Sequence, residues 1–267
     1  MRIAFIGGGN MGEAMIRSIL DGGVAKATDI AASDVSEARR SYLSQKYGIA
    51  ALPNNRSAAE KAEVIILAVK PVSMPEVMED LKGSIKPGQT ALSIAAGITL
   101  ARLCQGLDRK SVVRAMPNMP ALIGEGMTVW TATGDTKEED KQRARLVLGA
   151  LGKQVFVPDE KYIDMATAVS GSGPAYIFLI IESLIDAAVR IGLPRDLAHE
   201  LVLETVSGST HLIQKSGKHP AELRNQVTSP GGTTAEGLHE LEEGSLRALL
   251  ARAIIAAYEK AKALRGE

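Results

Sequence analysis

The sequence predicts an α/β fold in which an N-terminal doubly wound parallel sheet is followed by an all-helical domain. Short apolar runs alternate with amphipathic helical stretches as far as residue 159. The run 64–69 is continuously apolar, as expected for a strand buried on both faces. Beyond Asp159 the strand signal stops and long helical stretches take over. We therefore expect two domains, residues 1–159 and residues 160–267.

The first half alternates strands with helices in the order that a parallel sheet requires. Residues 2–6 form an apolar run that ends at glycine, and residues 10–20 carry apolar side chains at helical spacing. The other expected strands are 29–33, 64–69, 90–94, 112–116, 127–132 and 154–157. The other expected helices are 36–47 and 137–148.

The second half predicts helices alone, at 174–191, 196–215, 220–227, 235–242 and 246–263. The first of these is apolar on almost every face, and such a helix needs burial on all sides. A domain of about a hundred residues can hardly supply that burial by itself. We expect this helix in a subunit interface; a central helix of a monomeric bundle is the alternative.

Composition excludes several classes of protein. Lys plus Arg equal Asp plus Glu at 31 each, and aromatic residues make up 3%, so neither nucleic acid nor an anionic membrane is an expected partner. The single cysteine, Cys104, excludes an intramolecular disulfide and a cysteine metal cluster, and we expect no metal site. The residues after Met1 do not resemble a signal peptide, and no uncharged apolar run reaches membrane-spanning length. We expect a cytoplasmic protein.

Three glycines follow the first expected strand. Gly7, Gly9 and Gly12 form a G-x-G-x-x-G pattern, in which the first permits a tight turn, the second admits a pyrophosphate and the third allows close packing of helix on strand. This position predicts the dinucleotide site of a Rossmann fold; a turn that serves packing alone is the alternative. Lys70-Pro71 follows the most apolar strand, at the sheet edge where ligands bind, although Lys70 is equally well explained as a surface lysine.

The end of the second expected strand bears on the choice of cofactor. Asp34 is an acid about twenty positions beyond the glycines, which favours the ribose hydroxyl of NAD. Ser33, Arg39 and Arg40 can instead accept the 2′-phosphate of NADP. Asp34 with Glu37 also has the spacing of a helix capping box. The residues by themselves leave the choice open.

The turn 229–234, Ser-Pro-Gly-Gly-Thr-Thr, is the most informative segment of the second half. Its glycines bare backbone N–H groups ahead of a helical stretch and its hydroxyls crowd the same turn, so it can hold a carboxylate without Lys or Arg. The turn 170–174 is similar, with Pro174 at an expected first helical position and Gly173 as its cap. Two such N-termini directed at one spot attract an anion. Ordinary capping, as Thr233 with Glu236 would provide, is the alternative.

No nucleophile–base constellation stands out. The four histidines lie among polar neighbours and are expected at the surface: His199, His211, His219 and His239. Hydride transfer needs two planar groups held face to face rather than a strong nucleophile. The sequence therefore favours a reductase over a hydrolase.

With these residues in view, the chain resembles the Δ1-pyrroline-5-carboxylate reductase family over essentially its whole length. The resemblance includes the opening glycine motif and the segments 68–71 and 93–97. Its most specific parts are the segments 114–118, 170–176 and 227–242. It implies a Rossmann domain followed by a helical dimerisation domain, assembled as a homodimer or a ring of dimers.

The resemblance also implies a reaction, the reduction of the cyclic imine to L-proline by NAD(P)H. The substrate contacts it implies are Glu160, Ser229, Gly231, Gly232, Thr233 and Thr234, with Thr234 beside the ring nitrogen as the catalytic proton relay. The resemblance also implies the cofactor contacts, to which we add Gly12 from the glycine pattern. They are Gly7, Gly9, Asn10, Met11, Gly12, Ser33, Asn55, Val69, Lys70, Pro71 and Ala96. Family members commonly use NADPH, so we expect NADP, with NAD as the alternative because Asp34 would repel a 2′-phosphate.

Two other readings remain. The β-hydroxyacid dehydrogenases share the glycine motif and a glycine–serine turn, but they carry a catalytic lysine on the helix after that turn. Here that position is Ile177, and no lysine occurs between Lys161 and Lys215. A nucleotide sensor without chemistry would keep the cofactor turn but need no anion-binding turns in the helical half.

Overall fold

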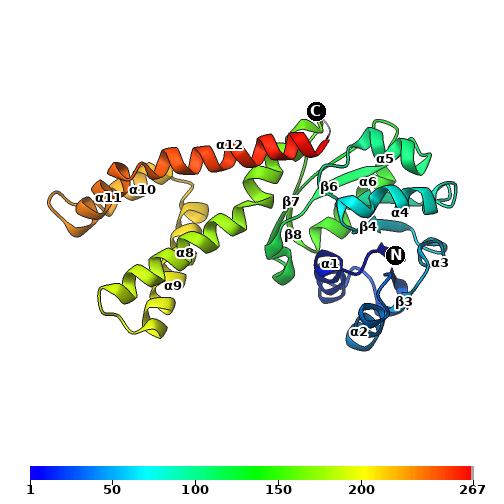
Figure 1. Ribbon diagram of the computed structural model, residues 1–267, viewed down its shortest axis with the longest axis horizontal. Helices are drawn as coiled ribbons and strands as arrows, with labels where there is room; N and C mark the ends of the chain where they lie inside the picture. Colours follow the sequence, from blue (N-terminus) through cyan, green and yellow to red (C-terminus); the bar gives the residue numbers. More distant parts are fainter. Residues whose placement is uncertain (266–267) are drawn as a thin grey trace. The chain divides into compact units, whose positions relative to one another are not determined.

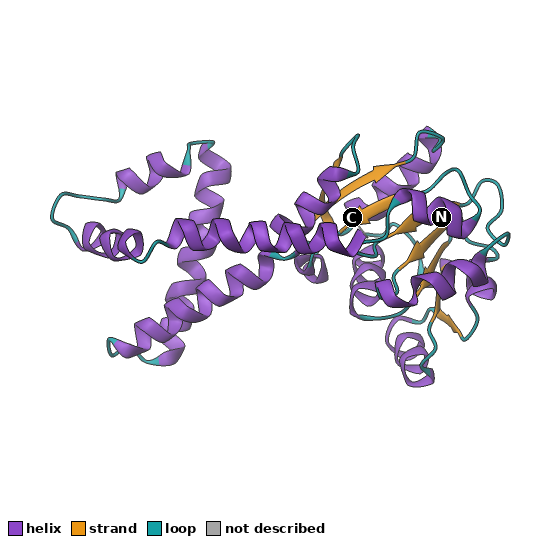
Figure 2. Cartoon of the chain, turned by 45° about the horizontal axis from the view of Figure 1, so that its top comes forward, coloured by secondary structure: helices purple, strands orange, loops and turns teal. Residues whose placement is uncertain are grey.

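The computed structural model describes residues 1–265 and divides into two compact units. The first contains Met1–Ser172 together with the end of the chain from Ala257 on, and the second contains Gly173–Ala256. Every strand belongs to the first unit, whereas the second is helical throughout (Figure 2). The boundary expected after residue 159 thus precedes the end of the first compact unit.

The first unit, the sheet unit, is built on eight strands in the order β3-β2-β1-β4-β5-β6-β7-β8 (Figure 1). Neighbours from β3 to β6 in this order are parallel, which confirms the predicted doubly wound parallel sheet. β7 runs antiparallel to β6, and β8 is parallel to β7. The strands are β1 Ile3–Ile6, β2 Ile30–Ser33, β3 Ala50–Leu52, β4 Val64–Leu67, β5 Thr90–Ser93, β6 Val113–Met116, β7 Gly126–Ala132 and β8 Gly152–Phe156.

Helices cover both faces of this sheet and form one apolar core on each face. Successive residues of a strand point to opposite faces, so they enter different cores. Ile3 and Phe5 pack with α1, α2 and α6, whereas Ala4 and Ile6 pack with α3, α4 and α5. The helices of this unit are α1 Asn10–Asp21, α2 Glu37–Tyr47, α3 Asn55–Ala59, α4 Met74–Leu81, α5 Leu100–Leu107, α6 Glu138–Gly149 and α7 Lys161–Ala166. Short 3₁₀ turns are η1 Ala27–Asp29, η2 Pro71–Ser73 and η3 Met119–Ile123, and η4 Thr167–Gly171 is a π-helical turn.

β1 is the third strand of the sheet and lies between β2 and β4. The chain adds strands on one side as far as β3 and then crosses to begin the other side with β4. Ligands of such sheets bind at this switch point, outside the carboxyl ends of the strands. The glycine turn after β1 and the Lys70-Pro71 loop after β4 lie at this edge.

The second unit, the helical unit, contains α8 Gly173–Arg190, α9 Arg195–Ser216, α10 Pro220–Gln226, α11 Thr233–Glu243 and the first part of α12 Leu246–Arg265. All five helices were predicted. The helix start expected at residues 173–174 is confirmed, since α8 begins at Gly173 after the bend at Ser172. The residues before it, Lys161–Gly171, are also helical, with a π turn at Thr167–Gly171, which the sequence did not predict. Pro174 has no N–H to donate to the carbonyl of Ser170, which instead accepts from Nδ2 of Asn118 at 3.0 Å.

Little of the helical unit is buried within the chain. Among its described residues, the buried apolar side chains are Ile185 and Ala198. The helical run Lys161–Arg190 is long and apolar enough to cross a membrane by length and composition alone, and 11% of its most apolar stretch is buried. Its large side chains at Phe178 and Leu179 are 53% and 61% exposed.

Candidate functional site

The glycine turn after β1 has the shape that its sequence predicts. Gly7 has a φ of +99°, which favours glycine. A Cβ on Gly12 would lie 2.5 Å from the carbonyl oxygen of Gly7, so α1 approaches the turn as closely as the third motif glycine allows. A Cβ on Gly9 would meet no atom within 4 Å. The open side of the turn is therefore at Gly9, where α1 begins without a side-chain cap.

Gly8, which the glycine pattern leaves unspecified, lies against α2. A Cβ there would lie 2.5 Å from Cδ1 of Leu43 on α2. Its N–H donates to Oδ2 of Asp34 at 3.0 Å, and the other carboxylate oxygen of Asp34 accepts from the N–H of Ser36 at 2.9 Å. Asp34 therefore ties the end of β2 to the glycine turn. It does not cap α2, whose N-cap is Ser36.

The other predicted cofactor residues lie at the carboxyl ends of neighbouring strands. The Ser33 hydroxyl donates to Oδ1 of Asn55 at 2.7 Å, and Asn55 donates to Oδ2 of Asp80 at 3.0 Å. Val69 covers Gly7, because a Cβ on Gly7 would lie 2.8 Å from Cγ1 of Val69. Lys70 and Pro71 are exposed where η2 begins.

Ala96 lies in the loop after β5, half-buried beside Gly97. Gly97 has a φ of +74°, and a Cβ on it would lie 2.8 Å from Cβ of Leu264. The end of α12 therefore packs against the loop that carries Ala96.

Glu160 is part of a buried ionic cluster in the sheet unit. Its Oε1 accepts from the N–H of Leu100, the first residue of α5, at 2.8 Å, and from Arg114 at 2.6 Å. Arg114, 1% exposed, also pairs with Asp164 at 3.0 Å, and Asp164 pairs with Arg265 at 2.6 Å. These contacts fasten residues 160–172 to the sheet. A substrate contact for Glu160 stays a prediction.

The turn before α11 is formed within the helical unit. The N–H of Gly232 donates to the carbonyl of Ser229 at 3.1 Å, and Gly231 has a φ of +67°. Pro230 and Gly231 thus take the central positions of a tight turn whose third residue needs positive φ. α11 begins at Thr233 after the N-cap Gly232, with no side-chain cap, so the capping box of Thr233 with Glu236 does not form. Thr234 lies half-buried in the first helical turn.

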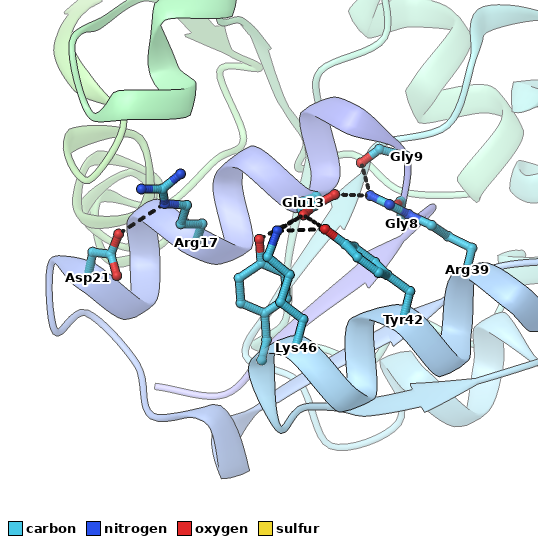
Figure 3. Close-up of polar contacts among 9 residues, drawn as sticks. Gly8, Gly9, Glu13, Arg17, Asp21, Arg39, Tyr42 and Lys46 are labelled. Atoms are coloured by element: carbon cyan, nitrogen blue, oxygen red, sulfur yellow. Dashed lines mark hydrogen bonds and ion pairs between the residues drawn. The ribbon is translucent and has the colours of Figure 1, made fainter.

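A cluster on α1 and α2, not predicted from the sequence, surrounds Glu13 (Figure 3). Its carboxylate accepts from Tyr47 at 2.7 Å, from Tyr42 at 2.9 Å and from Lys46 at 3.0 Å, and it also pairs with Arg39. Burial alone would raise the pKa of Glu13, but these hydrogen bonds outweigh it and lower the pKa from 4.5 to about 2. Glu13 is therefore ionised throughout the neutral range.

Within residues 1–265, no group of three or more His, Cys, Asp or Glu side chains is arranged to hold a metal ion.

Known proteins resemble this chain along its entire length. Residues 160–264 match the family model for pyrroline-5-carboxylate reductase dimerisation, and residues 2–97 match that for NADP oxidoreductase, coenzyme F420-dependent. A pyrroline-5-carboxylate reductase of Synechocystis is 39% identical over 99% of this chain and 98% of the relative. One of Arabidopsis thaliana is 38% identical over 98% of this chain and 95% of the relative. The crystal structure of a Plasmodium falciparum pyrroline carboxylate reductase with NADP bound is 32% identical, with a TM-score of 0.92 over 99% of this chain and 98% of that one.

Proposed function

Because this chain belongs to the pyrroline-5-carboxylate reductase family, we propose that it reduces Δ1-pyrroline-5-carboxylate to L-proline with NADPH as the hydride donor. Hydride goes from C4 of the nicotinamide to the imine carbon, the ring nitrogen gains one proton, and the C=N bond becomes single. The observation that carries the proposal is the full-length similarity. Both the glycine turn and the turn 229–234 lie within the residues that the family models match.

The sheet unit fits a dinucleotide because its glycine turn is open at one residue and closed at the others. Gly9 leaves space for a pyrophosphate, whereas Gly12 lies against the Gly7 carbonyl and Gly8 against the Leu43 side chain. We assign the cofactor to Gly7, Gly9, Asn10, Met11, Gly12, Ser33, Asn55, Val69, Lys70, Pro71 and Ala96. NADP is supported by the Plasmodium relative, and the carboxylate of Asp34 is the feature that opposes a 2′-phosphate. Kinetics with NADPH and NADH in parallel test this choice; a large advantage for NADH would contradict it.

The turn 229–234 suits the substrate carboxylate. Its glycines and the N-terminus of α11 offer N–H groups, and Ser229 and Thr233 add exposed hydroxyls. An imine accepts hydride more readily once it is protonated to an iminium. A turn without a cation holds the carboxylate and does not repel that positive ring. We assign the carboxylate to Ser229, Gly231, Gly232 and Thr233.

Thr234 is the proposed partner of the ring nitrogen and the relay of its proton. We expect Thr234→Ala to lower turnover by about one to three orders of magnitude, because one oriented donor and its help in proton transfer are lost. Thr234→Ser keeps the hydroxyl and should recover most of the rate. Steady-state rates of the folded variants test this role. If the alanine and serine variants both turn over at nearly the wild-type rate, Thr234 does not relay the proton.

The helical unit is the proposed site of assembly, as a homodimer or a ring of dimers. Its apolar surface at Phe178 and Leu179 is exposed in the single chain, and the family model matched there describes dimerisation. Burial against lipid is less suitable, because the same helix carries Glu182 and Asp186. We propose a protein of the cytoplasm, with no nucleic-acid or membrane partner.

One assay tests the whole proposal. Purified protein with NADPH and Δ1-pyrroline-5-carboxylate should consume the 340-nm absorbance of the reduced nicotinamide and form one proline for each NADPH oxidised. NADPH binding without proline formation would favour a nucleotide sensor instead.

A further inference from the structure

Arg39 of α2 donates hydrogen bonds to the backbone of the glycine turn. Its Nε donates to the carbonyl oxygen of Gly8, and its Nη2 donates to the carbonyl oxygen of Gly9 at 3.4 Å. Its aliphatic stem passes near the turn, since a Cβ on Gly8 would lie 3.8 Å from Cγ of Arg39. One guanidinium thus contacts two consecutive peptide groups of the turn (Figure 3).

The direction of these carbonyls fixes the direction of the next two amides. In a trans peptide the C=O and the following N–H point in opposite directions. The carbonyl of Gly8 belongs to the peptide of the Gly9 amide, and the carbonyl of Gly9 to that of the Asn10 amide. The carbonyl of Gly9 also accepts from the N–H of Glu13 at 2.8 Å, so α1 itself sets the direction of the Asn10 amide. Because Arg39 draws the Gly8 carbonyl toward α2, the N–H of Gly9 is directed away from α2. This N–H lies at the start of α1, the kind of position at which proteins bind phosphate anions.

Glu13 keeps the guanidinium in this orientation. It lies on α1, pairs with Arg39, and is itself held by Tyr42, Lys46 and Tyr47 of α2. The Arg39 and Glu13 side chains are 24% and 16% exposed, so the pair is partly shielded from water. The planar fork of arginine can reach two carbonyls and a carboxylate together, whereas a lysine ammonium cannot reproduce that geometry.

We propose that Arg39, oriented by Glu13, is a positioning residue that presets the Gly9 amide, beside the Asn10 amide held by α1, for the pyrophosphate of the dinucleotide. It touches neither the pyrophosphate nor the 2′-phosphate. The inference rests on the proposed function, because it takes the dinucleotide to be seated on the glycine turn.

The test compares Arg39→Lys and Arg39→Met with the wild-type protein, and uses Arg17→Met as the control. Arg17 is on α1 and is 54% exposed, paired with Asp21 on the same helix. Titration calorimetry gives the Kd of NADPH, and competition gives that of adenosine 2′-monophosphate, which has no pyrophosphate. We expect both Arg39 variants to bind NADPH roughly ten- to a hundredfold more weakly, the usual loss for hydrogen bonds to a charged group. Adenosine 2′-monophosphate should bind within about twofold of wild type, and kcat at saturating NADPH should change little, since the effect is on KM for the cofactor.

Other outcomes overturn the inference in distinct ways. An Arg39→Lys variant with wild-type affinity would mean that charge rather than geometry matters. Equal weakening of adenosine 2′-monophosphate would make Arg39 a direct 2′-phosphate ligand. Loss of thermal stability with an unchanged Kd would leave Arg39 a purely structural role. If Arg39→Met does not fold, Arg39→Lys, which keeps the charge and most of the stem, decides the case. Failure of the wild-type protein to bind NADPH would refute the proposed function instead.

Discussion

The two compact units reach stability in different ways. The sheet unit has two apolar cores, one on each face of the sheet, with side chains such as Phe5, Ile66 and Trp130 fully buried. The helical unit of a single chain buries Ile185 and Ala198 among its described apolar residues and exposes larger ones. A sheet covered by helices completes its core within one chain, whereas this helical unit must obtain burial from another surface.

This difference has a consequence for function. The proposed cofactor turn lies in the unit that completes its own core, and the proposed substrate turn lies in the unit that does not. Cofactor binding should therefore be independent of assembly, whereas turnover should depend on it.

The largest expected effect comes from a charge on the exposed face of α8. Leu179→Glu places a carboxylate in the proposed subunit interface, where an unpaired buried charge is strongly unfavourable. We expect dimer affinity to fall by at least about a hundredfold and turnover to fall with it, while the Kd of NADPH stays within about threefold. Light scattering over a range of protein concentrations, together with calorimetric titration, measures both.

Leu146→Glu on α6 is the matched control. Leu146 is 50% exposed in the sheet unit, against 61% for Leu179, so its replacement should leave assembly and turnover unchanged. If the Leu179→Glu protein still assembles and is active, the helical unit does not depend on this face for burial, and the contrast between the two units is wrong.

The next effect is confined to the sheet unit. Gly12→Ala brings a Cβ to 2.5 Å from the carbonyl oxygen of Gly7, so α1 must move away from the turn. We expect NADPH to bind at least about tenfold more weakly, with assembly intact. Gly149→Ala, within α6, adds the same methyl group where no atom lies within 4 Å, and should bind normally. Tight NADPH binding by Gly12→Ala would contradict the close packing of α1 on the glycine turn.

The smallest effect depends on pH. The folded state lowers the pKa of Glu13 from 4.5 to about 2, so the stability that its charge contributes is complete above about pH 4.5 and is lost as the pH falls toward 2. Glu13→Gln should therefore lower the urea midpoint at pH 7, and its difference from wild type should shrink as the pH falls from 4.5 to 3. Glu60→Gln, at an exposed position, is the control. A difference that does not vary with pH would mean that the charge of Glu13 does not stabilise the fold.

Although α3, α4, α5 and α7 were not predicted, the sequence predicted seven of the eight strands, the helices at 10–20, 36–47 and 137–148, the glycine turn and the helical second half. These features depend on local chemistry: a continuous apolar run at 64–69, glycines placed after a strand, and helical spacing in α8 to α12. β3 escaped prediction because Ala50–Leu52 is short and weakly apolar. The glycine pattern identified Gly7, Gly9 and Gly12, since their roles follow from the turn itself.

Features that depend on residues distant in the chain became visible only in the folded protein. Leu43 of α2 lies against Gly8, and Arg39 reaches the glycine turn only because α2 packs beside α1. The antiparallel pairing of β7 with β6 and the π turn at Thr167–Gly171 have no signal in the local sequence. The spacing of residues along a chain specifies local conformation. Contacts between side chains far apart in the sequence depend instead on how the helices and strands pack together.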